Sequence, residues 1–286
     1  MDFLERKLCT GEEIRPLLRP LDRFAHKGTL GHALLIGGSL GKMGSVCLAS
    51  KAALRTGCGL VTAYVPRCGM TVVQTNVPEA MALQDNHAEF ITSVAFGLQP
   101  DAIGIGVGLG QHEETQTAFH AFLQRNRTSL VVDADGLNIL SQHSEWCALL
   151  PPETILTPHP KELSRLIGGW NDDAEKVRKT KELARRCRCI VVVKGAGTLI
   201  ISDAALFVNS TGTPALATAG SGDVLTGMIT SLLAQGYPPL DAARVGVYLH
   251  GLTADLTKET IHPRTFIASD IIDHIGDAYA FLEKKR

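Results

Sequence analysis

The sequence predicts one α/β domain whose mainly parallel central sheet carries helices on both faces. Short apolar runs alternate with longer helical patterns from about residue 32 to the end. Most of these runs lack polar alternation, which is typical of strands buried on both faces of a parallel sheet. No linker, low-complexity tract or internal repeat divides the chain. We therefore expect a single domain over residues 1–286, with residues 1–25 as an N-terminal extension.

The expected elements follow from these patterns in chain order. The mostly apolar runs predict strands at His32–Ile36, Leu60–Val65, Ala102–Val107, Leu130–Asp133, Thr154–Thr157 and Ile190–Val193. Apolar residues that recur every three or four positions predict helices at Ser45–Thr56, Glu113–Arg125, Asp172–Arg186, Val224–Ala234, Asp241–Thr257 and Ser269–Phe281. The runs Thr198–Ile201 and Ala205–Val208 are separated by three residues, which predicts an antiparallel hairpin.

Composition and charge exclude several classes of protein. The chain has 45% hydrophobic and 20% charged residues, which is typical of a globular protein rather than a disordered one. Its net charge of −1 gives no positive field for nucleic acid or an acidic membrane. No window approaches 18 consecutive apolar residues, and Met1–Arg19 has no apolar segment of a secretory signal. We expect a cytoplasmic protein that binds small molecules.

Two familiar nucleotide motifs fail in detail. Gly37–Met43 is similar to a phosphate-binding P-loop, but it is one residue too short, and Met43 stands where a Ser or Thr would bind Mg²⁺. Gly104–Gly110 has a glycine at every second position, which does not fit the dinucleotide-binding pattern. If a nucleotide binds here, another scaffold must hold it.

The strongest signal is Thr218-Ala219-Gly220-Ser221-Gly222-Asp223, which directly precedes the predicted helix Val224–Ala234. Small residues expose consecutive backbone N–H groups at a helix N-terminus, which favours a bound phosphoryl group. Asp223 has two readings: an ordinary cap or first-turn acid of the helix, or a base that takes the proton of an attacking hydroxyl. The Gly-Ser-Gly sequence before Asp223 favours the base, since an ordinary cap needs no such loop.

Three further polar turns follow predicted strands. Lys194–Thr198 is either a phosphate-holding or ribose-holding turn or only a hairpin connection. His159 stands between two prolines, and Glu162 either caps the following helix or orients metal-bound water. Val131–Asn138 places two carboxylates at a strand end. Because ligands of open α/β sheets bind at the carboxyl ends of the strands, we expect one shared crevice.

Several motifs together resemble those of the ADP/ATP-dependent NAD(P)H-hydrate dehydratases, a family of the ribokinase-like superfamily. The similarity runs from about His26 to Leu282, and its most specific segment is Pro214–Gly227. The motifs, in order, are His26-Lys27-Gly28, Gly37-Gly38-Ser39, Gly106–Gly110, Val132–Asp135, Thr157–Pro160, Lys194–Thr198 and Pro214–Gly227. The resemblance implies a ribokinase-like fold.

That resemblance also implies an activity and a set of roles. The family repairs hydrated NADH and NADPH (NADHX and NADPHX), in which water has added across a double bond of the nicotinamide ring. With Mg²⁺, ADP or ATP phosphorylates the ring hydroxyl, and the departing phosphate restores the ring. Asp223 would be the base. The nucleotide would be held by Lys194, Gly195, Ala196, Gly197, Thr198 and Gly222, and the substrate by Ser45, Gly108, His159 and Asp223.

The sequence departs from the family pattern at three places. Ser45 stands where the family commonly has Ala, Val107 replaces a Pro, and Thr213 replaces an Asn. The resemblance implies a homotetramer, for which the apolar stretch Gly44–Leu60 gives weak physical support. It also implies that a cooperating epimerase, usually fused at the N-terminus, is a separate chain here. Two alternatives stay open: a ribokinase-like kinase for a vitamin precursor or sugar, and a catalytically silent nucleotide-binding module.

Overall fold

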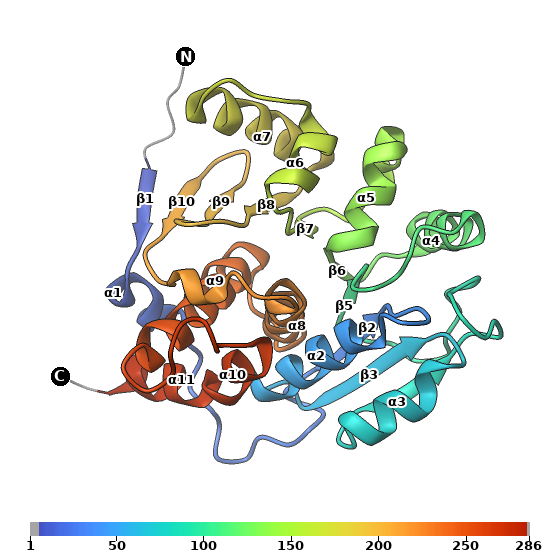
Figure 1. Cartoon of the computed structure of the whole chain (residues 1–286), viewed down its shortest axis with the longest axis horizontal. Helices are drawn as coiled ribbons and strands as arrows, with labels where there is room; N and C mark the ends of the chain where they lie inside the picture. Colours follow the sequence, from blue (N-terminus) through green and yellow to red (C-terminus); the bar gives the residue numbers. More distant parts are fainter. Residues whose placement is uncertain (1–5, 285–286) are drawn as a thin grey trace.

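A single ten-stranded sheet organises the chain, whose computed structural model describes residues 6–284 (Figure 1). The strand order is β1-β10-β9-β8-β7-β6-β5-β2-β3-β4. Strand β9 pairs antiparallel with β8 and with β10, and the other pairings are parallel. The expected mainly parallel sheet is therefore confirmed, as is the antiparallel hairpin.

The strands agree closely with the expected ones in the centre of the sheet. Strands β2, β3 and β8 have the expected bounds, whereas β5, β6 and β7 differ by one or two residues at their ends. The strands are β1 (Arg6–Cys9), β2 (His32–Ile36), β3 (Leu60–Val65), β4 (Met81–Gln84), β5 (Ala102–Ile105), β6 (Ser129–Val132), β7 (Ile155–Leu156), β8 (Ile190–Val193), β9 (Leu199–Ile201) and β10 (Leu206–Asn209).

The helices include all the expected ones, with one correction. The helix expected over Ser269–Phe281 is two helices, α10 and α11, that meet at His274. The helices are α1 (Gly11–Ile14), α2 (Met43–Arg55), α3 (Gly69–Asn76), α4 (Glu113–Arg125), α5 (Ala134–Gln142), α6 (Pro160–Ile167), α7 (Asp173–Cys187), α8 (Ser221–Ala234), α9 (Pro239–Thr257), α10 (Ala268–Asp273) and α11 (Ile275–Glu283). Short 3-10 helices cover Arg15–Leu17, Ser144–Leu149 and Pro214–Leu216.

The N-terminal extension contributes to the sheet. Residues 6–9 form the edge strand β1, which pairs in parallel with β10, while residues 1–5 lie outside the described part of the chain. The strand reads Arg-Lys-Leu-Cys, and three of its four residues are exposed. A short, charged strand at a sheet edge lacks the apolar run of a central strand, so the sequence pattern did not predict it.

Helices cover both faces of the sheet, as expected. Alternate residues of β2 belong to two separate cores: Ala33 and Leu35 to one, Leu34 and Ile36 to the other. The first core includes residues of α2, α8, α9, α10 and α11, and the second includes residues of α4, α5, α6 and α7. Side chains alternate between the faces of a strand, so this division shows that each face has its own helical layer.

Helix α2 is buried within this fold. Its residues Val46, Ala49, Ala52 and Ala53 are fully buried, and they belong to the same core as those of α8. Much of the apolar stretch Gly44–Leu60 therefore packs inside one chain. In the part of the chain from 6 to 284, no helix is long and apolar enough to cross a lipid bilayer.

Candidate active site

A cavity of about 660 Å³ lies where β6, β7 and β8 end and α8 begins. It brings together most of the residues singled out in the sequence. Its lining includes His159, Glu162, Lys194, Gly195, Ala196, Gly197, Thr198, Gly222 and Asp223. The expected crevice at the carboxyl ends of the strands is therefore present, and the chemical roles of its residues remain predictions.

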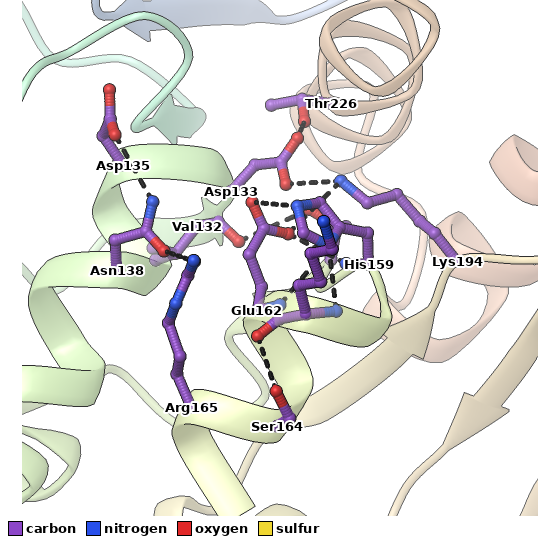
Figure 2. A network of polar contacts seen from close by, with 12 residues as sticks. Val132, Asp133, Asp135, Asn138, His159, Glu162, Ser164, Arg165, Lys194 and Thr226 are labelled. Carbon is purple, nitrogen blue, oxygen red and sulfur yellow. Dashed lines mark hydrogen bonds and ion pairs between the residues drawn. The ribbon is translucent and has the colours of Figure 1, made fainter. Parts of the chain in front are cut away.

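Lys194 lines the cavity, and a buried carboxylate holds its ammonium group (Figure 2). Its Nζ donates to Asp133 Oδ1 at 2.8 Å, and the other oxygen of Asp133 accepts from Thr226 Oγ1 at 2.7 Å. Asp133 is 1% exposed. A buried carboxylate with a cation and a hydroxyl donor is well satisfied, and it holds the ammonium in one place.

His159 and Glu162 form a reciprocal cap at the start of α6 (Figure 2). His159 Nδ1 accepts from the N–H groups of Lys161 and Glu162, and Glu162 Oε2 accepts from the N–H of His159 at 2.8 Å. The proton of the neutral imidazole therefore belongs on Nε2, which lies 3.3 Å from Glu162 Oε1. The capping reading of Glu162 is confirmed, and the cap fixes the His159 ring beside the cavity.

Glu162 also contributes negative charge to the site. Its side chain is buried, and Oε2 lies 3.9 Å from Lys194 Nζ. Burial raises the pKa of Glu162, while Lys194 and the His159 N–H act in the opposite direction. We call the set Asp133, His159, Glu162 and Lys194 the lysine side of the site.

A glycine and small residues form the start of α8, where the sequence predicts a phosphoryl-binding site. Gly220 is the N-cap residue and has φ +85°, a left-handed conformation that favours glycine. Helix α8 begins at Ser221, so Asp223 lies in its first turn and does not cap it. First-turn N–H groups of a helix have no partner within the helix. The N–H groups of Gly222 and Asp223 are therefore suited to phosphoryl oxygens.

Asp223 is less acidic than an ordinary aspartic acid. Its pKa is raised to about 6, mainly by burial and in part by the negative charges of Asp133 and Asp135. A hydrogen bond with Ser45 and the positive charge of Lys194 act in the opposite direction. A carboxylate with a pKa near 6 is ionised at neutral pH and is a stronger base than an exposed aspartate.

Ser45 and Gly108 lie outside the lining of the cavity and adjoin it through Asp223. Ser45 is on α2 and makes the hydrogen bond with Asp223. Gly108 has φ +60°, and a Cβ placed there would lie 2.6 Å from the carbonyl oxygen of Lys42 and 3.1 Å from the Ser45 Cβ. We call Ser45 and the turn Gly106–Gly110 the glycine side. Asp223 thus stands between the lysine side and the glycine side.

Three residues of the site had no role assigned from the sequence. Asp133 was recognised only as one of two carboxylates at a strand end, although it holds Lys194. Thr226 lies in the Pro214–Gly227 segment, but no role was assigned to it, and His250 in the middle of α9 was not singled out. His250 lines the cavity, and its Nε2 lies 3.0 Å from the carbonyl oxygen of Ser221. Burial lowers the pKa of His250 to about 4, so the ring is neutral at pH 7.

The donor set does not by itself form a metal site. Over residues 6–284, no group of three or more His, Cys, Asp or Glu side chains could hold a metal ion. Glu162 is a carboxylate that lines the cavity. Mg²⁺ usually keeps several waters and binds through one or two carboxylates together with phosphate oxygens. The residues therefore fit a Mg²⁺ ion that arrives with a nucleotide.

Comparisons with known proteins agree on one family. A family model described as NAD(P)H-hydrate dehydratase matches residues 33–276. The ADP-dependent (S)-NAD(P)H-hydrate dehydratase of Neisseria meningitidis is 34% identical over 274 residues, which cover 88% of each chain. The bifunctional NAD(P)H-hydrate repair enzyme Nnr of Moorella thermoacetica is 35% identical over 98% of this chain. This chain spans 55% of that enzyme, about half its length.

Solved structures give the same result. The ADP/ATP-dependent NAD(P)H-hydrate dehydratase of Bacillus subtilis, co-crystallised with ATP and Mg²⁺, superimposes with a TM-score of 0.82 at 29% identity. The alignment covers 97% of this chain and 99% of that one. A ribokinase-like superfamily protein of Enterococcus faecalis, 24% identical, has a TM-score of 0.81 and coverage of 97% and 98%. The ribokinase-like fold is confirmed.

Proposed function

This chain belongs to the NAD(P)H-hydrate dehydratase family, and we propose that it repairs hydrated NADH and NADPH with ADP or ATP. One observation carries the proposal. Asp223, a carboxylate made more basic by burial, stands between a phosphoryl-binding helix N-terminus and the glycine side. The two reactants of a phosphoryl transfer would therefore meet at a base.

The lysine side would receive the nucleotide. The turn Lys194–Thr198 and the first turn of α8 line one cavity, so ammonium and backbone N–H groups converge on the same space. Their positive potential would hold the phosphates and would offset charge on the transferring group. The Asp133 carboxylate keeps the ammonium in place before the nucleotide arrives.

Asp223 would act on the hydroxyl of the hydrated ring. The hydroxyl oxygen attacks the terminal phosphorus of the nucleotide, its proton passes to the Asp223 carboxylate, and the shortened nucleotide leaves. Phosphate then departs with the electrons of the ring C–O bond, and loss of a ring proton restores the dihydronicotinamide. Phosphate is a far better leaving group than hydroxide, which is the reason for the first step.

Mg²⁺ would bind with the nucleotide and neutralise charge on its phosphates. We propose that Glu162 orients one of the waters of that ion, in addition to its capping role. The carboxylate is suited to this because it lines the cavity and lies 3.9 Å from Lys194 Nζ. Its cap with His159 would prevent it from turning away.

The activity can be tested with purified protein, Mg²⁺ and hydrated NADH. Addition of ADP or ATP should restore the absorbance of the reduced nicotinamide and release phosphate, and no absorbance should return without nucleotide. Running ADP and ATP separately gives the preferred donor. A stable phosphorylated product without recovery of absorbance would instead favour a ribokinase-like kinase. Nucleotide binding with neither product would favour a silent binding module.

We also propose the assembly and setting that the sequence implies. A homotetramer is consistent with exposed apolar side chains at Leu21 and Phe24, which are 77% and 83% exposed in a single chain. Light scattering at micromolar concentration should give four subunits, and a monomer would overturn this part. A cytoplasmic location is part of this proposal. Adding an NAD(P)H-hydrate epimerase to the assay should extend repair to both epimers of the hydrate.

A further inference from the structure

The carboxylates of Asp133 and Asp135, two residues apart in the sequence, point in different directions (Figure 2). Ala134, between Asp133 and Asp135, has φ +47°, a left-handed conformation that is costly for a residue with a Cβ. The turn sends Asp133 toward Lys194 and Thr226, and Asp135 toward the glycine side. Such strain persists only where the surrounding contacts maintain it, so we expect both carboxylates to have fixed positions.

Asp135 contacts two separate segments of the chain, Gly110–Gln111 and Lys42. Its Oδ2 accepts from the N–H of Gly110 at 2.9 Å and lies 3.6 Å from Lys42 Nζ. Its Oδ1 accepts from Gln111 Nε2 at 3.0 Å. The side chain is 14% exposed, so these interactions are only partly screened by water. One carboxylate therefore joins the end of the glycine turn to the residue that precedes α2.

Those two segments are the ones that carry Ser45 and Gly108. Lys42 is the N-cap residue of α2, three positions before Ser45. Its carbonyl oxygen is also the atom that a Cβ on Gly108 would approach to 2.6 Å. The turn and the helix start are thus packed against each other, with Asp135 binding both at their common edge.

We propose that Asp135 is a positioning residue for the dinucleotide substrate, holding Gly106–Gly110 and the start of α2 at the separation that the substrate requires. The inference rests on the proposed function. Asp133 holds Lys194 in place on the lysine side, and in this proposal Asp135 holds the backbone segments of the glycine side in place. Asp135 itself need not touch the reacting atoms.

Arg165 and Asn138 form a chain of polar contacts that ends at Asp135 (Figure 2). Arg165 donates to Asn138 Oδ1 at 2.6 Å, and Asn138 Nδ2 lies 3.4 Å from Asp135 Oδ1. The longer contact is the weaker one. Asn138→Ala should therefore change the same quantities as a substitution of Asp135, in the same direction and by less.

The test measures the affinities for the dinucleotide and for ADP separately in the Asp135→Asn variant. The variant keeps the size of the side chain and loses its charge, so Lys42 is released and one N–H donor loses its acceptor. The KM for hydrated NADH and the Kd for NADH should rise about tenfold, as expected for losing one charge-assisted contact. The Kd for ADP should stay within about twofold, because Lys194 and α8 are untouched. Asp173→Asn, at an exposed ion pair with Lys176, is the matched control and should change neither.

A pH profile separates positioning from general damage. Asp223 faces Ser45, Asp133, Lys194 and Asp135, and the charges of Asp133 and Asp135 both raise its pKa. Asp135→Asn should therefore move the acid limb of kcat/KM toward lower pH. An unchanged acid limb together with an unchanged Kd for NADH would overturn the inference, as would equal weakening of ADP and NADH.

Two further readouts keep the result decisive. If Asp135→Asn folds poorly in thermal melting, Asn138→Ala and Asp135→Glu replace it, with a smaller rise in the Kd for NADH expected from each. NADH binding needs no turnover, so wild-type protein that binds NADH without restoring hydrated NADH would contradict the proposed function alone. Wild-type protein that fails to bind NADH would overturn the positioning role too.

Discussion

The two sides of the site are formed by different kinds of contact. On the lysine side, charged side chains meet in a buried network in which Asp133 and Glu162 are 1% and 5% exposed. On the glycine side, backbone segments approach so closely that a Cβ on Gly108 would lie 2.6 Å from a carbonyl oxygen. Substitutions on the first side should act through charge, and those within the turn Gly106–Gly110 through space.

Asp223 stands between the two sides and is influenced by residues of both. Its carboxylate is hydrogen-bonded to Ser45 and lies in the field of Lys194, Asp133 and Asp135. A group at such a junction can serve the reaction without being needed to bind either reactant. The comparison therefore predicts that binding and turnover can be separated at this one residue.

The largest effect is expected for Asp223→Asn. Loss of a general base should lower the rate of hydrated NADH repair by about 10²–10⁴, because the ring hydroxyl must lose its proton unaided. Nucleotide affinity should stay the same or increase slightly, since a negative charge near the phosphates is removed. The absorbance assay and calorimetric titration of ADP measure the two quantities. Near-wild-type repair would show that Asp223 is only a first-turn acid of α8.

Lys194→Ala tests the charged character of the lysine side. A charge-assisted hydrogen bond to phosphate contributes about 1.5–3 kcal/mol, so ADP should bind about 10- to 150-fold more weakly. The buried Asp133 would also lose its cation, which adds repulsion toward phosphate. Lys258→Ala, at an exposed position beyond α9, is the control and should leave the Kd for ADP unchanged. An unchanged Kd in Lys194→Ala would reduce the Lys194–Thr198 turn to a hairpin connection.

Gly108→Ala tests the steric character of the glycine side. A left-handed conformation costs a residue with a Cβ about 1–2 kcal/mol, and the backbone oxygen of Lys42 must also move. The KM for hydrated NADH should rise by about tenfold or more, while the Kd for ADP stays unchanged. Gly276→Ala, in α11 with open space around the Cβ position, should alter neither. A weaker ADP complex in Gly108→Ala would mean that the two sides are not separate.

A smaller effect, on stability, should accompany the loss of activity in Asp223→Asn. The pKa of Asp223 is raised from 3.8 to about 6, so folding favours the protonated acid, and its ionisation destabilises the fold as pH rises through this range. Two pKa units correspond to at most about 3 kcal/mol. Removing the ionisation should raise the Tm at pH 8 by a few degrees and by about half as much at pH 5. Equal changes at both pH values would contradict a buried, ionised Asp223.

The sequence predicted the centre of this molecule better than its edges. Strands β2, β3 and β8 are buried on both faces, so burial alone dictates their apolar residues. Strand β1 is short and charged, and its place is decided by pairing with β10, which no local pattern encodes. The break between α10 and α11 at His274 also left no signal, because apolar periodicity continues across it.

The site shows the same division. Asp223 and the Lys194–Thr198 turn were found because glycines and polar residues interrupt apolar patterns at strand and helix ends. Asp133 and Asp135 were visible as a pair, but their separate partners depend on the left-handed turn at Ala134. His250 reaches the cavity from the middle of α9, where only the packing of α9 against α8 brings it to Ser221.

The pH dependence of kcat/KM for hydrated NADH tests most directly whether Asp223 is the base between the two sides. Wild-type protein should lose about tenfold in rate for each pH unit below an apparent pKa of about 6, because the protonated acid cannot accept the hydroxyl proton. The residual rate of Asp223→Asn should lack this acid limb. A wild-type rate that is constant from about pH 5 to 8, or an acid limb that survives in Asp223→Asn, would contradict this role for Asp223.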